Sequence, residues 1–66
     1  MKERLKELRL EKGLTQKQVA DYLGITDRGY GYYESGLREP SIECLKKLCD
    51  LFEVSADYLI GRSDSY

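Results

Sequence analysis

Between most of the glycines of this chain, apolar residues recur at intervals of three and four, the spacing of a helix, and do not alternate as in a strand. The glycines and a single proline divide this pattern into five segments. The pattern predicts five helices and no strand, over about residues 2–12, 16–23, 27–35, 42–52 and 56–60. We therefore expect an all-α fold, a compact five-helix bundle, as one domain over residues 1–61 with a flexible tail over 62–66.

Short hydroxyl side chains stand directly before four of these segments, where they can accept a hydrogen bond from an N–H of the first helical turn. They are Thr15, Thr26, Ser41 and Ser55. The segment after Ser41 has the clearest buried face, with apolar residues at i, i+3, i+4 and i+7, namely Leu45, Leu48, Cys49 and Phe52. In the first segment, helical spacing places Leu5, Leu8 and Arg9 on one face and leaves Leu10 half exposed.

The two short segments over 16–35 contain the residues that a closely crossing pair of helices requires. Ala20 is small enough for the crossing, and Gly24 can adopt the left-handed conformation of a tight turn. Apolar residues stand where the pair must be buried, at Val19, Leu23, Ile25, Tyr30 and Tyr33. On the second helix, spacing predicts an inner face of Tyr30, Tyr33, Glu34 and Leu37, and an outer face of Arg28, Gly31, Tyr32 and Ser35.

This window, QKQVADYLGITDRGYGYYES over 16–35, resembles the helix-turn-helix of phage-repressor and Cro-type proteins, the xenobiotic-response-element (XRE) family. The resemblance runs from about Leu5 to Gly61 and includes the strings LRLEKGLTQ, YESGLREPS and VSADYLIG. It implies a lambda-repressor-like DNA-binding domain that binds a two-fold operator as a homodimer, with the helix over 27–35 in the major groove. We accordingly expect a sequence-specific transcriptional regulator of the repressor type, with double-stranded DNA as its partner.

The resemblance also implies roles for single residues. Gln16 would hold a DNA phosphate, and Ser35 and Arg38 would contact the DNA backbone after the recognition helix. The positions that read bases match Asp27, Arg28, Gly29 and Tyr32. Arg9 and Glu34 each lie on an otherwise apolar face and need a partner of opposite charge, and the resemblance implies that they form a structural ion pair with each other.

Physical chemistry supports part of this assignment independently. The N–H groups and the positive dipole end at the start of the 16–23 helix favour a phosphate, to which Gln16 adds donors and Lys17 adds charge. Arg28 can donate two parallel hydrogen bonds to guanine. Tyr32, one turn later, can contact a thymine methyl or a phosphate and can stack with Arg28.

Two departures from the family pattern, together with the charge balance, leave a second function open. Asp27 brings a carboxylate to a DNA-facing position, and Leu37 stands where a basic residue is common. The net charge is −1: residues 1–38 hold eight Lys and Arg against six Asp and Glu, whereas residues 39–66 hold three against six. The alternative is a protein-interaction or antitoxin-like module that keeps the fold and binds DNA weakly.

Size and composition exclude other classes. A chain of 66 residues is too small to form a catalytic pocket, and it contains no histidine to act as a general base. We therefore do not expect an enzyme. Cys44 and Cys49 would face different sides of a helix, so neither a metal site nor a cofactor is expected. No apolar run exceeds three residues, which argues against a membrane span or a signal-peptide core and predicts a cytoplasmic protein.

The longest apolar run, Tyr58, Leu59 and Ile60, is the predicted dimer interface, because one short helix cannot bury all three side chains.

Overall fold

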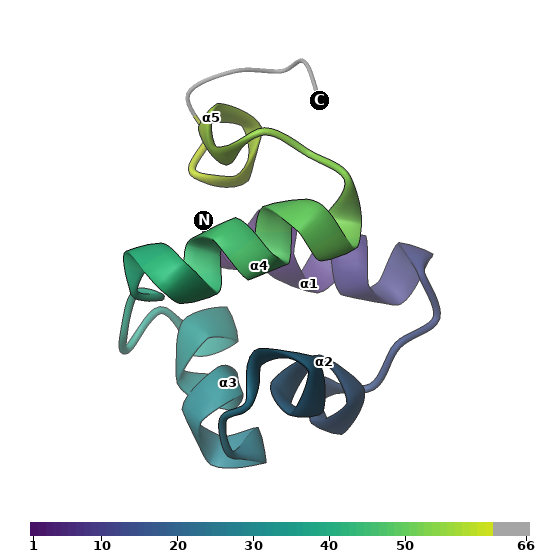
Figure 1. The fold of residues 1–66 in the computed structure, drawn as a ribbon, viewed down its shortest axis with the longest axis vertical. Coiled ribbons are helices and arrows are strands. Elements are labelled where there is room, and N and C mark those ends of the chain that lie inside the picture. Colours follow the sequence, from purple (N-terminus) through teal and green to yellow (C-terminus); the bar gives the residue numbers. More distant parts are fainter. Residues whose placement is uncertain (62–66) are drawn as a thin grey trace.

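The computed structural model describes residues 1–61, and within that range it contains five α-helices and no strand (Figure 1). They are α1 (Lys2–Glu11), α2 (Gln16–Leu23), α3 (Asp27–Ser35), α4 (Ile42–Phe52) and α5 (Ala56–Leu59). The all-α prediction is confirmed, and each predicted boundary lies within one residue of the observed one. The predicted tail over 62–66 lies outside the described residues. Across residues 1–61, no helix is long and apolar enough to cross a membrane.

Side-chain caps explain where four of the helices begin. The Thr15 hydroxyl accepts a hydrogen bond from the Gln18 N–H at 3.1 Å, and Gln18 Oε1 accepts one from the Thr15 N–H at 2.8 Å, which completes a capping box. The hydroxyls of Thr26, Ser41 and Ser55 accept equivalent bonds at 3.0, 3.2 and 3.1 Å. Short-range hydrogen bonds therefore set these starts, as the sequence predicts.

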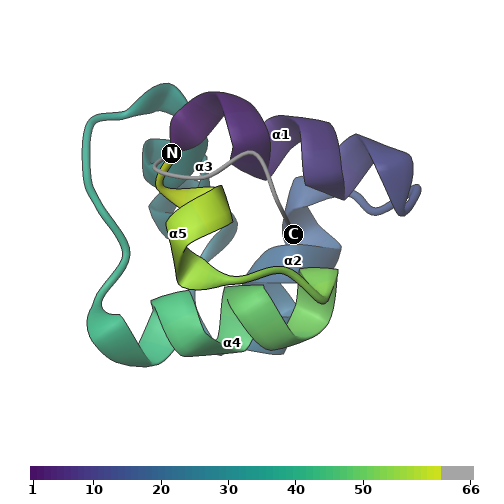
Figure 2. The ribbon, with the colours of Figure 1, turned by 90° about the horizontal axis from the view of Figure 1, so that it is seen from above.

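The helices form a bundle in which α2 and α3 make one end and α5 makes the other (Figure 1). Helices α1 and α4 lie between these ends, and the view from above shows them on opposite sides of α5 (Figure 2). The two helices of the 16–35 window pack mainly on each other, while α3 also packs on α1 and α2 on α4. One side of the α2–α3 pair therefore faces solvent.

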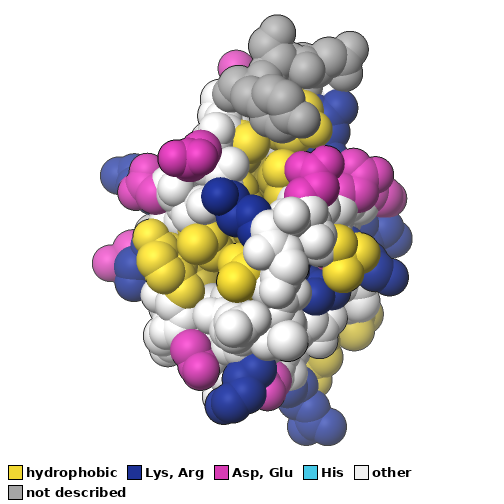
Figure 3. All heavy atoms as spheres, turned by 90° about the vertical axis from the view of Figure 1, so that its right-hand side faces the viewer, with side chains coloured by type: hydrophobic (Ala, Val, Ile, Leu, Met, Phe, Trp, Pro, Cys, Tyr) yellow, Lys and Arg dark blue, Asp and Glu magenta, His cyan; other side chains and the backbone are white. Residues whose placement is uncertain are grey.

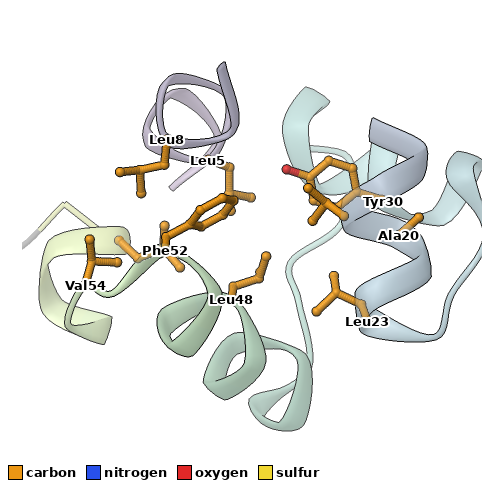
Figure 4. Packing of buried hydrophobic residues seen from close by; sticks show 10 residues of the cluster. Leu5, Leu8, Ala20, Leu23, Tyr30, Leu48, Phe52 and Val54 are labelled. Carbon is orange, nitrogen blue, oxygen red and sulfur yellow. The ribbon is translucent and has the colours of Figure 1, made fainter. Parts of the chain in front are cut away.

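The core is one cluster to which all five helices contribute. Its buried members are Leu5, Leu8, Val19, Ala20, Leu23, Tyr30, Leu48, Phe52, Val54 and Leu59. In Figure 4, Phe52 of α4 points toward α1, and Leu48 of α4 points toward Leu23 and Tyr30. Burying a side chain of this size contributes about 1.5 to 3 kcal/mol, so the α4 side chains add to the direct packing of α1 on α3.

The structure corrects the predicted inner face of α3 at Leu37, whose side chain is 74% exposed. The helix ends at Ser35, and Gly36 follows in the left-handed conformation with φ +84°. Gly36 turns the chain out of the helix, so helical spacing no longer applies at the next residue, Leu37. The other predicted inner residues are buried (Tyr30) or half-buried (Tyr33 and Glu34).

We expect Gly31→Ala to raise the free energy of unfolding by about 0.5 to 1 kcal/mol, because glycine inside a helix costs that much relative to alanine. A Cβ at Gly31 would have its nearest neighbour, Gln16 Oε1, at 3.9 Å, which is an ordinary contact. Urea denaturation followed by circular dichroism measures the gain, and a loss of stability would contradict the expectation.

Gly36→Ala is the matched control, with the opposite expected sign. Gly36 has φ +84°, and a Cβ there would lie 2.8 Å from the Lys2 Cδ atom. A β-carbon in the left-handed region costs about 1 to 2 kcal/mol, so this variant should be less stable than the parent.

Candidate nucleic-acid interface

A tight turn joins α2 to α3 and uses the two small residues that the sequence analysis singled out. Ala20 is completely buried. Gly24 ends α2 with φ 75° and ψ 30°, and its N–H donates to the Asp21 carbonyl at 3.2 Å. The Ile25 N–H then donates back to the Ala20 carbonyl at 3.0 Å. The turn is closed by its own backbone, which fixes how α3 leaves α2.

The outer face of α3 presents the residues predicted to read bases. Asp27 and Arg28 are exposed in the first turn, and Gly29 and Tyr32 are half-buried. The Gly29 N–H already donates to the Thr26 hydroxyl at 3.0 Å, and a Cβ at Gly29 would lie 3.1 Å from that oxygen. The Gly29 N–H is therefore used by the helix cap and is not a free donor. Because Gly29 has no side chain, it leaves space for a binding partner.

Arg38, from the loop after α3, lies over the ring of Tyr32. Its guanidinium carbon is 5.5 Å from the ring centre, within the range of a cation–π contact. We predicted Arg28 as this stacking partner, but the loop folds back, and the Arg38 N–H donates to the Tyr32 carbonyl at 3.3 Å. Leu37 lines the same shallow hollow, of about 270 Å³. Arg38 is thus held beside the outer face of α3.

Ser35 closes the end of α3 with its side chain. The hydroxyl donates to the Tyr32 carbonyl at 3.1 Å and accepts from the Leu37 N–H at 3.4 Å. A phosphate offers only acceptor oxygens, so Ser35 can bind one only after its hydroxyl releases the carbonyl. The structure therefore gives Ser35 a local capping role first.

Gln16 and Lys17 are exposed at the start of α2, where the positive end of the helix dipole lies. Lys17 Nζ is 3.9 Å from Asp21 Oδ2, and both side chains are well exposed, so this is a weak pair that leaves the ammonium free to bind an anion. Gln16 is held more firmly, because its Nε2 donates to Glu34 Oε1 at 3.1 Å. On the face shown in Figure 3, Lys and Arg side chains are spread over the whole surface, the α2–α3 end included, with Asp and Glu side chains among them.

The structure brings Arg9 of α1 and Glu34 of α3 into a two-bonded ion pair. Arg9 Nε donates to Glu34 Oε2 at 2.6 Å, and Arg9 Nη2 donates to Glu34 Oε1 at 3.2 Å, with the two side chains 11% and 6% exposed. Burial alone would raise the pKa of Glu34, but the hydrogen bond from Arg9, with those of its other neighbours, outweighs burial and lowers this pKa. Both groups are therefore charged at neutral pH.

The three predicted dimer residues separate in the structure. Leu59 is 0% exposed and belongs to the core, which is incompatible with the prediction that it forms a dimer surface. The single turn of α5 directs Leu59 inward, whereas Ile60, just beyond the helix, stays 37% exposed. Tyr58 is half-buried, with the Arg4 guanidinium carbon 4.2 Å from its ring centre and Arg4 Nη1 donating to its carbonyl at 2.7 Å.

Besides the stacking of Arg38 on Tyr32, sequence reasoning missed two contacts between distant residues, that of Arg4 with Tyr58 and that of Gln16 with Glu34. They join residues 54 and 18 positions apart, and no rule of helical spacing connects such positions. One signal was available for the second contact. A carboxylate has about four acceptor positions, so Glu34 can take more donors than Arg9 alone supplies.

A family model described as "Helix-turn-helix" matches residues 5–59 of this chain. The chain belongs to this XRE-type helix-turn-helix family. The resemblance inferred from residues 16–35 is thereby confirmed, and α3 corresponds to the second helix of the motif.

Relatives and solved structures support the same fold for this helix-turn-helix domain. It is 50% identical over 58 residues to the SPbeta prophage-derived uncharacterized HTH-type transcriptional regulator YonR of Bacillus subtilis, covering 88% of this chain and 54% of that protein. A crystal structure of a transcriptional regulator from Listeria innocua matches with a TM-score of 0.89 and 37% identity, over 98% of this chain and 61% of that one.

A more distant structure, the P22 c2 repressor in complex with a synthetic operator, shares the fold with a TM-score of 0.87 and 24% identity over 94% of both chains. The helix-turn-helix domain spans about half the length of the curated relatives it matches.

Proposed function

We propose that this helix-turn-helix domain binds double-stranded DNA sequence-specifically, as the DNA-binding part of a transcriptional regulator of the repressor type. The outer face of α3 carries the proposal, because Arg28 and Tyr32 lie one turn apart on the helix that such motifs place in the major groove. The YonR relative is named a transcriptional regulator, and the P22 c2 repressor structure holds an operator. The proposal includes no catalytic step and no cofactor, and it places the domain in the cytoplasm.

The proposed roles divide into base reading and phosphate binding. Arg28 donates to guanine O6 and N7, and Tyr32 contacts the neighbouring base or its phosphate. Asp27 can only accept hydrogen bonds, from the amino groups of cytosine N4 or adenine N6, which makes it a selective rather than a strong contact. Gln16 and Lys17 at the start of α2 and Arg38 after α3 bind phosphates, with Ser35 and Gly29 contributing little beyond their caps.

Selection of bound duplexes from a random pool, followed by binding titrations on the selected and a scrambled duplex, tests this function. We expect the selected duplex to bind about 10³-fold or more tightly than the scrambled one. No measurable binding of the parent chain to any duplex would contradict the proposal. That result would favour the protein-interaction or antitoxin-like module, to which Asp27 and the 74% exposed Leu37 are suited.

We propose further that two copies bind a two-fold operator together, in contact through Ile60 and the exposed part of Tyr58, with their α3 helices about 34 Å apart. Sedimentation equilibrium at high micromolar concentration should show a dimer, and Ile60→Asp should shift it toward the monomer. Leu37→Asp is the matched control, since Leu37 is also exposed but lines a hollow with Tyr32 and Arg38 after α3, and should leave the dimer intact. A parent chain that is monomeric both free and on the selected duplex would contradict this proposal.

A further inference from the structure

The side-chain amide of Gln16 lies along one turn of α3. Its Nε2 atom donates to Glu34 Oε1 at 3.1 Å, while its Oε1 atom lies 3.9 Å from the position of a Cβ on Gly31. Gly31 and Glu34 are three residues apart in the same helix, so they are neighbours on one face of it. The first residue of α2 is therefore docked on the helix that carries the proposed base contacts.

The Glu34 carboxylate decides the orientation of this amide. An ionised carboxylate has only acceptor atoms, so it can bind the amide nitrogen but not the amide oxygen. One of the two Nε2 hydrogens is used in this bond, and the other remains available to an acceptor outside the domain. Glu34 is itself a fixed point, because its side chain is 6% exposed and bound twice by Arg9.

Arg9 also ties down the loop that leads into α2. Its Nη1 atom donates to the Leu14 carbonyl at 2.9 Å, directly before the Thr15 cap. The start of α2 is thus connected to the end of α3 twice, once through the Gln16 side chain and once through the loop backbone. Both connections pass through the same buried ion pair.

We propose that Glu34 is a positioning residue for DNA binding, which orients the Gln16 amide so that its second N–H meets a phosphate oxygen at a set place relative to α3. The inference rests on the proposed DNA-binding function and adds to it a residue that need not touch DNA. The bond between Gln16 and Glu34 joins the phosphate contact and the base-reading face into one rigid unit. Phosphate contacts fix the register of a protein on the duplex, so this unit would set the register of α3 in the groove.

Glu34→Gln tests the inference, because an amide that keeps its oxygen for Arg9 Nε has its nitrogen at the position of Oε1, which both Arg9 Nη2 and Gln16 Nε2 contact. The Gln16 amide must then reverse. Gln16→Ala alone should weaken duplex binding about tenfold per protomer, as expected for a lost bond to a charged group. Glu34→Gln should weaken binding about three- to tenfold in the parent and less than about twofold in the Gln16→Ala background. Equal losses in the two backgrounds, or no loss in the parent, would overturn the inference.

Lys17→Ala is the matched control for this cycle. Lys17 is the next exposed residue of α2, and its ammonium pairs loosely with Asp21 rather than with Glu34. The losses caused by Lys17→Ala and Glu34→Gln should therefore multiply. A coupling to Lys17 as large as that to Gln16 would mean that Glu34 acts on the whole start of α2, which overturns a specific role for the amide.

Side-chain ¹⁵N relaxation of the DNA-free parent decides the geometry without any variant, so it holds even if Glu34→Gln does not fold. The Gln16 Nε2 group should have an order parameter near that of rigid backbone, about 0.85 rather than below about 0.6. A flexible Gln16 amide in the parent would overturn the inference while leaving DNA binding intact. A rigid amide in a chain that binds no duplex would overturn the proposed function, and the positioning role with it.

Discussion

Arg9→Met and Glu34→Leu should each lower the free energy of unfolding by about 3 to 5 kcal/mol, because each leaves the opposite charge buried without its partner. The side chains are only 11% and 6% exposed, and the Nε to Oε2 distance is 2.6 Å, so little water can replace the lost partner. A domain of this length has a total stability of about 3 to 10 kcal/mol, so either variant should be close to unfolding. Urea denaturation followed by circular dichroism measures both losses.

The double variant should be more stable than the two single losses predict, because neither charge is then left alone. Additivity within about 0.5 kcal/mol would contradict the coupling. Lys17→Met with Asp21→Leu is the matched control, since that pair is 3.9 Å apart and its side chains are 70% and 65% exposed. We expect no measurable coupling there, because exposed pairs are solvated in either case.

The same ion pair predicts a pH dependence in the acid range. The pKa of Glu34 is lowered in the folded domain, so the unfolded chain binds this proton more tightly. The stability that Glu34 contributes is complete above its unfolded pKa of about 4.3 and is lost as the pH falls through the folded value. Unfolding free energies measured over this range should fall more steeply for the parent than for the double variant. Parallel curves for the two proteins would contradict the expectation.

Arg28→Ala should weaken binding to the selected operator about five- to 150-fold, which corresponds to about 1 to 3 kcal/mol for a lost two-bonded contact to guanine. The loss on a scrambled duplex should be far smaller, because Arg28 is exposed in the first turn of α3 and is assigned to a base rather than to a phosphate. Preference for one guanine in each half-site should relax as well. Binding isotherms on both duplexes measure these differences.

Replacing residues assigned to phosphates should weaken DNA binding in a different way. Gln16→Ala and Arg38→Ala should weaken binding to both duplexes by similar factors, because every duplex presents the same backbone. Arg38→Ala should also reduce the slope of log affinity against log salt by about one per protomer, whereas Arg28→Ala should leave this slope nearly unchanged. If Arg28→Ala instead costs the same on both duplexes, Arg28 does not read a base.

The sequence by itself determined the helices, their starts and most of the core. The capping hydroxyls of Thr15, Thr26, Ser41 and Ser55 bond to backbone groups three residues away, so each start depends on a few neighbouring residues. Helical spacing likewise identified Leu48 and Phe52 as buried, because the period of a helix is known before its partners are. Ala20 and Gly24 predicted the close pair of helices for the same local reason.

Only the tertiary structure decided which distant groups meet. The exposure of Leu37 and the stacking of Arg38 on Tyr32 follow from the direction in which the chain leaves Gly36. The spacing of apolar residues does not predict that direction. The burial of Leu59 depends on how α5 sits across α1 and α4. The contact of Gln16 with Glu34 requires two helices to cross at one angle, and such a contact between residues 18 positions apart exists only when the whole bundle is assembled.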